Sequence, residues 1–584
     1  MPEIVARPVD EPACARLIAA GCDARLARLF AARGVASKEE LETTLKALAA
    51  PAGLAHVEDA ARLLADAIER AERLLVIADY DADGATACAL AVRALRGLGG
   101  HVGYLVPNRF EHGYGLTPEI AREAAKRSPA ILVTVDNGIA ALEGVAEANR
   151  LGMRVLVTDH HLPGAQRPDA ACIVNPNQAG CGFPSKHLAG VGVIFYVMLA
   201  LRAEMRRRGA FASRAEPNLA ELLDLVALGT VADVARLDAN NRILVAQGIA
   251  RIRAGRACAG IAALLEVAER DPRQAGTYEL AFSIGPRLNA AGRLQDMSLG
   301  IECLLADERA AALEMATRLD ALNRERREIE VEMQESALAM LASIEAGDAY
   351  TLSIHREDWH AGVVGLLASR LKDRFHRPVF AFAADAPGKL KGSGRSVPAL
   401  HLRDALDLVD KRSPGVLERF GGHAAAAGVT VAREKLEAFR AAFEAVARER
   451  LTPADLLLRI ECDGELAEAD VSLDFARVLR EQVWGQGFAE PRFAGTFAVE
   501  SQRVVGEKHL KLTLGFAGRR IPAIRFGVPD ALPPSIRAVY RLDVNEYQGA
   551  SSLQLVIEHV GDVPRFPQER TGVPPKRKRG TSPV

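Results

Sequence analysis

The stretch Leu75-Val-Ile-Ala-Asp79-Tyr-Asp81-Ala-Asp83-Gly84 places three carboxylates, two residues apart, directly after a short apolar run. The run Leu74–Ala78 is typical of a buried strand, because it is short, continuous and apolar. A calcium loop of the EF-hand type also begins D-x-D-x-D-G. That loop needs a helix before it and a bidentate Glu at position twelve, where this chain has Leu90. The EF-hand interpretation is therefore excluded, and the three carboxylates need another reason to lie together.

Further apolar runs follow the first one, separated by Ala-rich segments with helical patterning. The runs are Leu74–Ala78, Val102–Val106, Ile131–Val135, Val155–Val157 and Ala171–Val174. This alternation predicts a mostly parallel sheet wrapped by helices.

Polar clusters stand directly after four of these five runs. After the first run come Asp79, Asp81 and Asp83, and later runs are followed by Asp136-Asn-Gly138, Thr158-Asp-His160-His161 and Asn175-Pro-Asn177. In open α/β sheets, ligands bind in the crevice at the carboxyl ends of the strands. We therefore expect one site at this edge of the sheet.

The rest of the chain supplies further candidate residues. Asp224–Asp233 predicts a helix interrupted near Gly229 that delivers Asp233, and Gly285–Arg293 predicts a glycine-punctuated loop with two arginines. Leu319–Leu341 contains no helix breaker and predicts a long connecting helix. After Pro453, short alternating runs with turn signals predict a small β-barrel.

These patterns divide the chain into six parts. They are an N-terminal helical segment (1–70), an α/β domain (71–305), a long connecting helix (306–346), a second α/β domain (347–452), a β-barrel (453–560) and a disordered basic tail (561–584).

Composition limits the function classes. The chain has 584 residues, 74 basic and 75 acidic, and its net charge of -1 predicts no general affinity for polyanions. Any nucleic-acid binding therefore requires a local basic patch. The eight cysteines form no C-x-x-C pair, which indicates a reducing compartment. With no signal-peptide pattern and no membrane-length apolar run, we expect a cytoplasmic protein without membrane contact.

The converging carboxylates and histidines indicate divalent metal ions. Several such groups in one crevice would repel one another unless protons or cations neutralise them. Oxygen ligands mixed with imidazole suit Mn²⁺, with Mg²⁺ as a substitute. Six or more ligands exceed what one ion needs, so we expect two ions. A pair of metal ions about 3.5–4 Å apart is a common device for hydrolysing phosphate esters.

At this point the residues carry a family resemblance. Asp79-Tyr-Asp-Ala-Asp-Gly84, Asp136-Asn-Gly138, Asp159-His-His161 and Asp233 resemble, in order, the four motifs of the DHH phosphoesterase superfamily. The second α/β domain, with Gly392-Ser-Gly-Arg395 and Phe420-Gly-Gly-His423, resembles the DHH-associated domain. The trailing barrel points to the branch of the superfamily that degrades single-stranded DNA. The resemblance covers roughly residues 25–560.

The resemblance implies an exonuclease that hydrolyses single-stranded DNA from its 5′ end and releases mononucleotides, with a role in DNA repair and recombination. It implies a metal shell of Asp79, Asp81, Asp83, Asp136, His160 and Asp233. Asp136, His160 and His161 are the implied catalytic residues, with His161 beside the scissile phosphate. The implied DNA-binding residues are Arg109, Arg287, Asn289, Ser393, Arg395 and His423. We expect a monomer that works with a single-strand-binding protein and a helicase.

The barrel is expected to be an OB fold that leads the strand to the crevice. Its basic residues are Arg503, Lys508, His509, Lys511, Arg519, Arg520 and Arg525, and its candidate stacking residues are Phe493, Phe516, Phe526 and Tyr547.

Two alternatives for the function stay open. One is a superfamily member acting on short oligonucleotides, cyclic dinucleotides or pyrophosphate, and the other is a non-catalytic binding protein with this fold. The barrel argues against the first, and the intact Asp and His motifs argue against the second.

Overall fold

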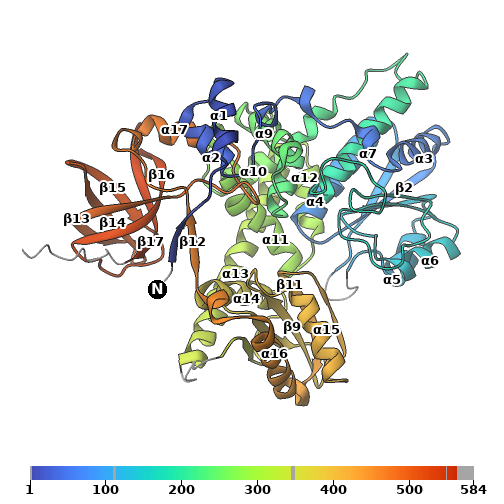
Figure 1. Ribbon diagram of the computed structural model, residues 1–584. Coiled ribbons are helices and arrows are strands. Elements are labelled where there is room, and N and C mark those ends of the chain that lie inside the picture. The colour runs from blue at the N-terminus through green and yellow to red at the C-terminus, as the bar shows by residue number, and fades with distance from the viewer. Residues whose placement is uncertain (1–2, 109–113, 343–348, 548, 562–584) are drawn as a thin grey trace, which may run out of the picture. The chain divides into compact units, whose positions relative to one another are not determined.

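The computed structural model describes residues 3–108, 114–342, 349–547 and 549–561 (Figure 1). These residues form two compact units. The larger unit contains residues 8–458 and 482–490, and the smaller contains residues 3–7, 459–481 and 491–561.

The first sheet of the larger unit has five strands, all parallel, in the order β3-β2-β4-β5-β6. The strands are β2 (Arg73–Ala78), β3 (His101–Leu105), β4 (Ile131–Val135), β5 (Arg154–Thr158) and β6 (Cys172–Val174). Each agrees within one residue with a predicted apolar run. The central strand β4 is buried at every position, as expected of a parallel sheet covered on both faces.

Thirteen helices of the larger unit precede its second sheet in the described chain. They are α1 (Glu11–Ala19), α2 (Ala24–Ala31), α3 (Val57–Glu69), α4 (Ala82–Gly97), α5 (Pro118–Ala125), α6 (Leu142–Arg150), α7 (Gly190–Arg207), α8 (Leu223–Ala232), α9 (Ala239–Arg253), α10 (Ala259–Val267), α11 (Gly285–Leu294), α12 (Ser298–Leu305) and α13 (Arg309–Ala342). α5 and α6 bury Ile120 and Val145 against Leu75 and Leu132 of the sheet. The long connecting helix is confirmed, because α13 runs for 34 residues.

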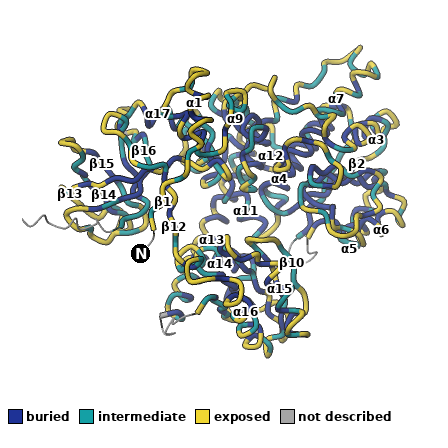
Figure 2. Tube along the Cα trace, viewed as in Figure 1, coloured by how far each residue is buried: buried dark blue, intermediate teal, exposed yellow. Residues whose placement is uncertain are grey.

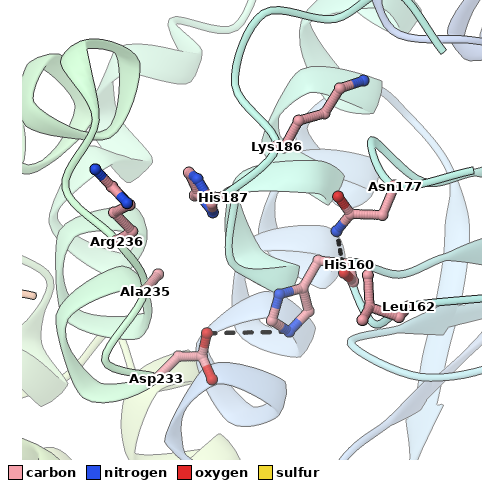
Figure 3. A pocket seen from close by; sticks show the side chains of 8 residues that line it. All are labelled: His160, Leu162, Asn177, Lys186, His187, Asp233, Ala235 and Arg236. Atoms are coloured by element: carbon pink, nitrogen blue, oxygen red, sulfur yellow. Dashed lines mark hydrogen bonds and ion pairs between the residues drawn. The ribbon is translucent and has the colours of Figure 1, made fainter. Parts of the chain in front are cut away.

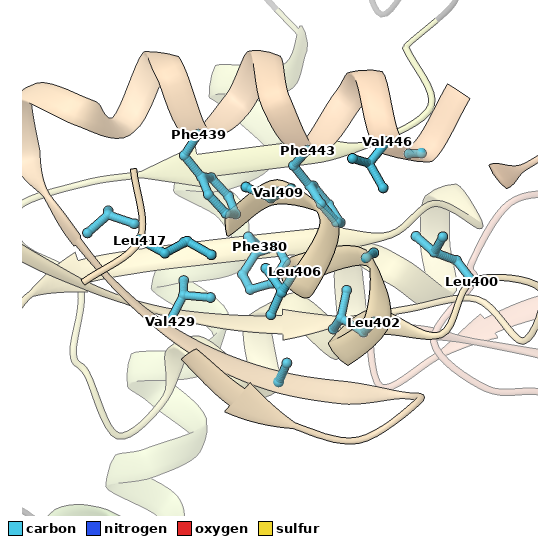
Figure 4. Close-up of a cluster of buried hydrophobic side chains, with 14 of the residues drawn as sticks. Phe380, Leu400, Leu402, Leu406, Val409, Leu417, Val429, Phe439, Phe443 and Val446 are labelled. Carbon is cyan, nitrogen blue, oxygen red and sulfur yellow. The ribbon is translucent and has the colours of Figure 1, made fainter. Parts of the chain in front are cut away.

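The second sheet of the larger unit has the order β10-β11-β9-β8-β7. Its elements are β7 (Leu352–His355), α14 (Val364–Phe375), β8 (Val379–Ala384), β9 (Lys389–Arg395), α15 (Leu402–Arg412), β10 (Arg419–Gly422), β11 (Ala426–Ala432) and α16 (Leu436–Arg450). Figure 4 shows the core between this sheet and α16. There the Phe380 ring meets the rings of Phe439 and Phe443 edge-on, with centroids 5.2 and 5.1 Å away.

The smaller unit is a closed barrel with strand order β13-β14-β15-β17-β16, which confirms the predicted barrel. Its elements are β1 (Glu3–Ala6), β12 (Arg459–Cys462), α17 (Leu473–Glu481), β13 (Phe493–Val505), β14 (His509–Phe516), β15 (Arg519–Arg525), β16 (Ser535–Tyr547) and β17 (Ala550–Gly561). Phe493 is 2% exposed and belongs to the barrel core, so its prediction as a stacking residue was wrong. The predicted basic tail lies outside the described residues from position 562 onward.

The N-terminal segment differs from the prediction of helices throughout 1–70. Its first described residues form strand β1, which pairs in parallel with β12, so that Glu3 lies opposite Arg459. The partner strand lies at the far end of the chain, so no local pattern could indicate this pairing. The segment also contains several short 3-10 turns between α2 and α3.

Two glycine-bearing segments are more regular than predicted. α8 continues through Gly229 without a break, because the missing side chain lets α8 approach α4. A Cβ on Gly229 would lie 2.2 Å from the Thr86 hydroxyl and 2.9 Å from a carboxylate oxygen of Asp83. Likewise Gly285–Arg293, predicted as a loop, is helix α11. In both cases the glycines serve close packing between elements and do not end a helix.

Burial follows the two sheets and the helices packed against them, as Figure 2 shows. In the described part of the chain, no helix combines the length and the apolar character that crossing a bilayer requires.

Candidate metal centre

The junction between β2 and α4 positions the first three carboxylates. Asp81 caps α4, because its carboxylate accepts hydrogen bonds from the backbone N–H groups of Asp83 and Gly84, each at 3.0 Å. Asp79 and Asp83 are buried, with exposed fractions of 4% and 1%. The alternating carboxylates are therefore a strand-to-helix turn that directs acidic side chains to one edge of the sheet.

Asp83 is also fixed by the helix that lies beside it. Its two carboxylate oxygens accept hydrogen bonds from the N–H groups of Gly190, at 2.6 Å, and Val191, at 2.9 Å. These donors belong to the first turn of α7, where backbone N–H groups have no partner within the helix. A negative charge is stabilised at such a helix end.

Asp136 follows β4 in an unusual backbone conformation. Its φ of 62° lies in the left-handed region, which few residues other than glycine adopt. Such conformations cost of order 1–3 kcal/mol each and cluster at functional sites. The same feature occurs at Val234, with φ 59°, directly after Asp233 at the end of α8.

The histidine pair after β5 is held by a buried carboxylate. One oxygen of Asp159 accepts hydrogen bonds from the backbone N–H groups of His160 and His161 and lies 2.8 Å from Nδ1 of His161. Its other oxygen accepts a hydrogen bond from the N–H of Ile139 at 2.9 Å. Asp159 therefore orients the pair.

The predicted metal-binding residues converge at this edge. Three overlapping groups bring their ligand atoms within 4.8 Å of one another. They are Asp79, Asp81 and Asp136; Asp83, His160 and Asp233; and Asp136, His160 and His161. Nε2 of His160 lies 3.0 Å from Asp136, and 4.0 Å from both Asp83 and Asp233. All six residues of the predicted metal shell thus lie together.

The carboxylates of this cluster repel one another when they are ionised. Burial, together with the negative charge of Asp81, raises the pKa of Asp83 to about 7. Burial and the neighbouring carboxylates likewise hold the pKa values of Asp136 and Asp233 well above the usual range. Burial lowers the pKa of His160 to about 4, so its ring is neutral at pH 7 and can act as a ligand.

The donor set fits divalent cations. Nε2 of His160 and Oδ1 of Asp136 are buried atoms that make no hydrogen bond with the described residues, although they lie 3.0 Å apart. Buried polar atoms are normally hydrogen-bonded, so this orphaned pair is suited to a third group that both atoms contact. Carboxylate oxygens with imidazole nitrogen are suitable ligands for Mn²⁺, and carboxylates also suit Mg²⁺.

We expect the metal-free protein to lose stability as pH rises from about 4 to about 7. In that window folded Asp83 holds a proton that the unfolded chain has lost, so rising pH favours unfolding, by on the order of 4 kcal/mol over the window. Urea unfolding in EDTA at pH 5 and pH 7.5 measures the effect, and Mn²⁺ should remove it. Asp83→Asn is the matched control and should reduce the slope in EDTA, while Asp136 and Asp233, whose pKa values are also raised, keep the remainder. An unchanged slope in that variant would contradict the assignment.

The predicted phosphate-binding residues of the second sheet lie at the start of a helix. Ser393 and Arg395 project from β9, and a guanidinium nitrogen of Arg395 lies 3.2 Å from the Ser393 hydroxyl. A Cβ on Gly365, in the first turn of α14, would lie 3.0 Å from that hydroxyl and 3.2 Å from Arg395. Both side chains therefore lie close to the positive end of α14, where anions bind readily.

The other predicted DNA-binding residues are in mixed surroundings. Burial and the charge of His161 lower the pKa of His423, which follows β10. Asn289 accepts a hydrogen bond from the N–H of Ala82 at 2.9 Å. Arg287 is buried and forms an ion pair with Asp320 of α13 at 2.8 Å. A phosphate bound by Arg287 would therefore share its guanidinium with Asp320. Arg109 lies outside the described residues.

Residues that the sequence analysis did not assign to the centre hold the histidine pair in place. The side-chain amides of Asn175 and Asn177 donate hydrogen bonds to the backbone carbonyls of His161, at 2.9 Å, and His160, at 2.6 Å. The Tyr114 hydroxyl donates to the carbonyl of Asp136 at 3.2 Å. The asparagines follow a strand end, as the ligands do, and that was the signal available for them.

Comparison with known proteins agrees with this geometry. Three family models match the chain: the DHH family N-terminal domain over residues 73–230, the DHHA1 domain over 347–449 and the RecJ OB domain over 462–559. The single-stranded-DNA-specific exonuclease RecJ of Dickeya dadantii is 51% identical, covering 92% of this chain and 96% of its own. RecJ of Escherichia coli K12 is 50% identical, covering 92% and 95%. The chain belongs to the RecJ family.

The solved structures of RecJ proteins share the same fold. RecJ of Thermus thermophilus in complex with Mn²⁺ has a TM-score of 0.80 and 30% identity, covering 96% of this chain and 79% of its own. The complex of RecJ from the same organism with Mg²⁺ has a TM-score of 0.74 and 28% identity, covering 96% and 78%. The DHH resemblance and the architecture predicted from it are therefore confirmed.

Proposed function

We propose that this protein is a metal-dependent exonuclease that hydrolyses single-stranded DNA from the 5′ end and releases mononucleotides. The convergence of the six predicted metal-binding residues at the edge of the first sheet is the observation that carries the proposal. Support also comes from its RecJ relatives. They are about 50% identical to this chain and are named as single-stranded-DNA-specific exonucleases.

Asp79, Asp81, Asp83, Asp136, His160 and Asp233 would hold two divalent ions. Bound Mn²⁺ or Mg²⁺ supplies a hydroxide nucleophile at neutral pH and stabilises charge on the phosphate oxygens. The chain's contribution is positional, since the α7 hydrogen bonds to Asp83 and the left-handed backbone of Asp136 set where the ligand atoms lie.

His161 is the cationic residue that we assign to the scissile phosphate. Burial acts to lower its pKa, but the contact with Asp159 outweighs burial and raises the pKa to about 9. The ring therefore carries its proton at pH 7. A cationic imidazole beside the scissile phosphate stabilises developing negative charge or gives its proton to the leaving oxygen.

The 5′ phosphate would bind to Ser393 and Arg395 at the start of α14. The guanidinium supplies paired donors to phosphate oxygens, and the helix end adds a positive potential. Arg109, Arg287 and Asn289 are proposed to contact the same strand, with His423 on a neighbouring phosphate.

We expect Arg395→Ala to reduce the preference for a 5′-phosphorylated end over a 5′-hydroxyl end by roughly 10- to 100-fold, as loss of a charge-assisted hydrogen bond predicts. The measurement is kcat/KM on two oligonucleotides that differ only at the 5′ group. Arg419→Ala removes an exposed arginine from strand β10 and serves as the control. An undiminished preference in Arg395→Ala would remove this residue from the role.

The barrel of the smaller unit is proposed to guide the strand. Arg503 of β13 and Lys511 of β14 are exposed and directly opposite each other in the sheet. Like charges in this position repel each other. A phosphate backbone bound between them would reduce this electrostatic repulsion. Phe526 is 55% exposed and its ring lies against His509, which makes it available for stacking on a base. The side chain of Tyr547 lies outside the described residues.

One assay tests the proposal as a whole. The purified protein with Mn²⁺ is given single-stranded and double-stranded DNA labelled at either end, and the order of product release is followed. Mononucleotides released from the 5′ end of the single strand are the expected result. Cleavage of duplex with equal rate, or release from the 3′ end, would contradict it.

We further propose that the protein works as a monomer with a single-strand-binding protein and a helicase.

A further inference from the structure

A cavity of about 280 Å³ opens on the metal centre (Figure 3). His160 and Asp233, two of the candidate metal ligands, line one side of it. Lys186, His187 and Arg236 line it as well, and the two charged side chains among them, Lys186 and Arg236, form what we call the cationic wall of the cavity. Among the described lining residues, Asp233 is the one carboxylate.

The cationic wall is a built feature of the fold. The buried side-chain amide of Asn241 donates hydrogen bonds to the backbone carbonyls of both His187, at 2.6 Å, and Arg236, at 2.9 Å. One amide thus ties together two segments that carry cationic side chains. The ammonium of Lys186 donates to the carbonyls of Pro176 and Cys181, at 2.8 and 2.6 Å, so it too has a fixed position.

Among the described residues, the guanidinium of Arg236 has no polar partner. Its guanidinium forms no ion pair or hydrogen bond with any residue that the structure describes, although many arginines of the larger unit are paired with carboxylates. The aliphatic part of the Arg236 side chain packs closely against Gly487, because a Cβ added to Gly487 would lie 2.5 Å from Cγ of Arg236. This contact holds the side chain in place. An arginine that is positioned but unpaired, beside a metal centre, is available to bind an anion.

We propose that this cavity binds the phosphate on the 3′ side of the scissile phosphate, which joins the second and third nucleotides of the strand. The inference rests on the proposed function, in which the scissile phosphate lies at the ligands His160 and Asp233. The 5′ end is assigned to Ser393 and Arg395, and no described residue of the second sheet lines the cavity. The cationic wall is therefore left for the 3′ side of the substrate.

This arrangement sets the shortest substrate that can use the cavity. A 5′-phosphorylated dinucleotide has a scissile phosphate but nothing after it to enter the cavity. A trinucleotide has that next phosphate, and its contact with Arg236 adds binding energy on the 3′ side of the scissile phosphate. Chain-length preference would thus be decided by a single charged contact.

The experiment compares kcat/KM on three 5′-phosphorylated substrates with Mn²⁺. They are a dinucleotide, a trinucleotide, and the same trinucleotide with a neutral methylphosphonate at its second internucleotide linkage. In the wild-type protein we expect the methylphosphonate to lower kcat/KM by roughly 10- to 100-fold, the size of a charge-assisted hydrogen bond. In Arg236→Gln the two trinucleotides should be cleaved equally, while the dinucleotide is cleaved as in the wild-type protein.

Two further variants sharpen the result. Arg236→Lys keeps the charge and should retain part of the methylphosphonate penalty. Arg256→Gln removes an exposed arginine that does not line the cavity, and it should leave the whole penalty in place. A penalty of equal size in the wild-type protein and Arg236→Gln overturns the inference. A second outcome would also overturn it: the wild-type protein shows no methylphosphonate penalty, and inhibition by a free mononucleotide depends on Arg236. The cavity would then bind the product and not the substrate strand. Failure to cleave any of the substrates would instead count against the proposed function.

Discussion

Asp136→Asn is expected to lower kcat/KM on single-stranded DNA by about 10³-fold or more while the protein stays folded. Asp136 shares one group of converging ligand atoms with Asp79 and Asp81, and its Oδ1 lies 3.0 Å from Nε2 of His160 in the group with Asp83 and Asp233, so its loss should affect both sets of ligands. Asparagine keeps the shape of the side chain and removes its charge. Since burial and the surrounding carboxylates already oppose ionisation of Asp136, the neutral amide should not destabilise the metal-free fold.

The measurements are steady-state kinetics, Mn²⁺ binding by calorimetry, and urea unfolding in EDTA. Asp224→Asn is the matched control, because Asp224 is an equally buried carboxylate of α8 that lies outside the three groups. It accepts hydrogen bonds from the N–H groups of Leu225 and Cys258, so its replacement should affect stability more than turnover. Full turnover in Asp136→Asn would contradict the two-ion site.

The sequence predicted the first sheet and the convergence of acids and histidines at its edge, for a shared physical reason. Strands buried on both faces are continuous apolar runs, and parallel strands end at the same edge. The acids and histidines that follow the runs therefore had to converge, although they are spread from Asp79 to Asp233. The long helix and the barrel were visible for similar reasons, since periodicity is a local property of the sequence.

The features that were missed depend on contacts between distant segments. Gly229 and the glycines of α11 suggested breaks, but tertiary packing overrides the low helix propensity of glycine. Phe493 is a core residue because of where β13 faces, which sequence alternation did not settle. The cationic wall of Lys186 and Arg236 also had no signal, because Asn241 brings their two segments together only in the folded chain.

Gly190→Ala tests whether packing alone positions the ligands, and we expect it to lower kcat/KM by about 10²-fold. An added Cβ would lie 2.4 Å from the Cβ of Asp136, so either Asp136 or the start of α7 must move. The N–H of Gly190 also holds the carboxylate of Asp83, so either movement displaces a ligand. A misplacement of about 1 Å can cost 10²-fold in rate, and overpacking of a core costs about 1–3 kcal/mol in stability.

Gly192→Ala is the control from the same helix turn. There the added Cβ would meet the Leu188 side chain, with a terminal methyl nearest at 3.2 Å, so a shift of that methyl by a few tenths of an ångström is enough. Alanine also favours the helix more than glycine does, so this variant should keep its activity and gain up to about 1 kcal/mol in stability. Equal kinetics in the two variants would show that the approach of α7 to Asp136 does not position the metal centre. Loss of activity in Gly190→Ala alone, with weaker Mn²⁺ binding, would place the cause at the ligands, because both variants add the same methyl group to the same helix.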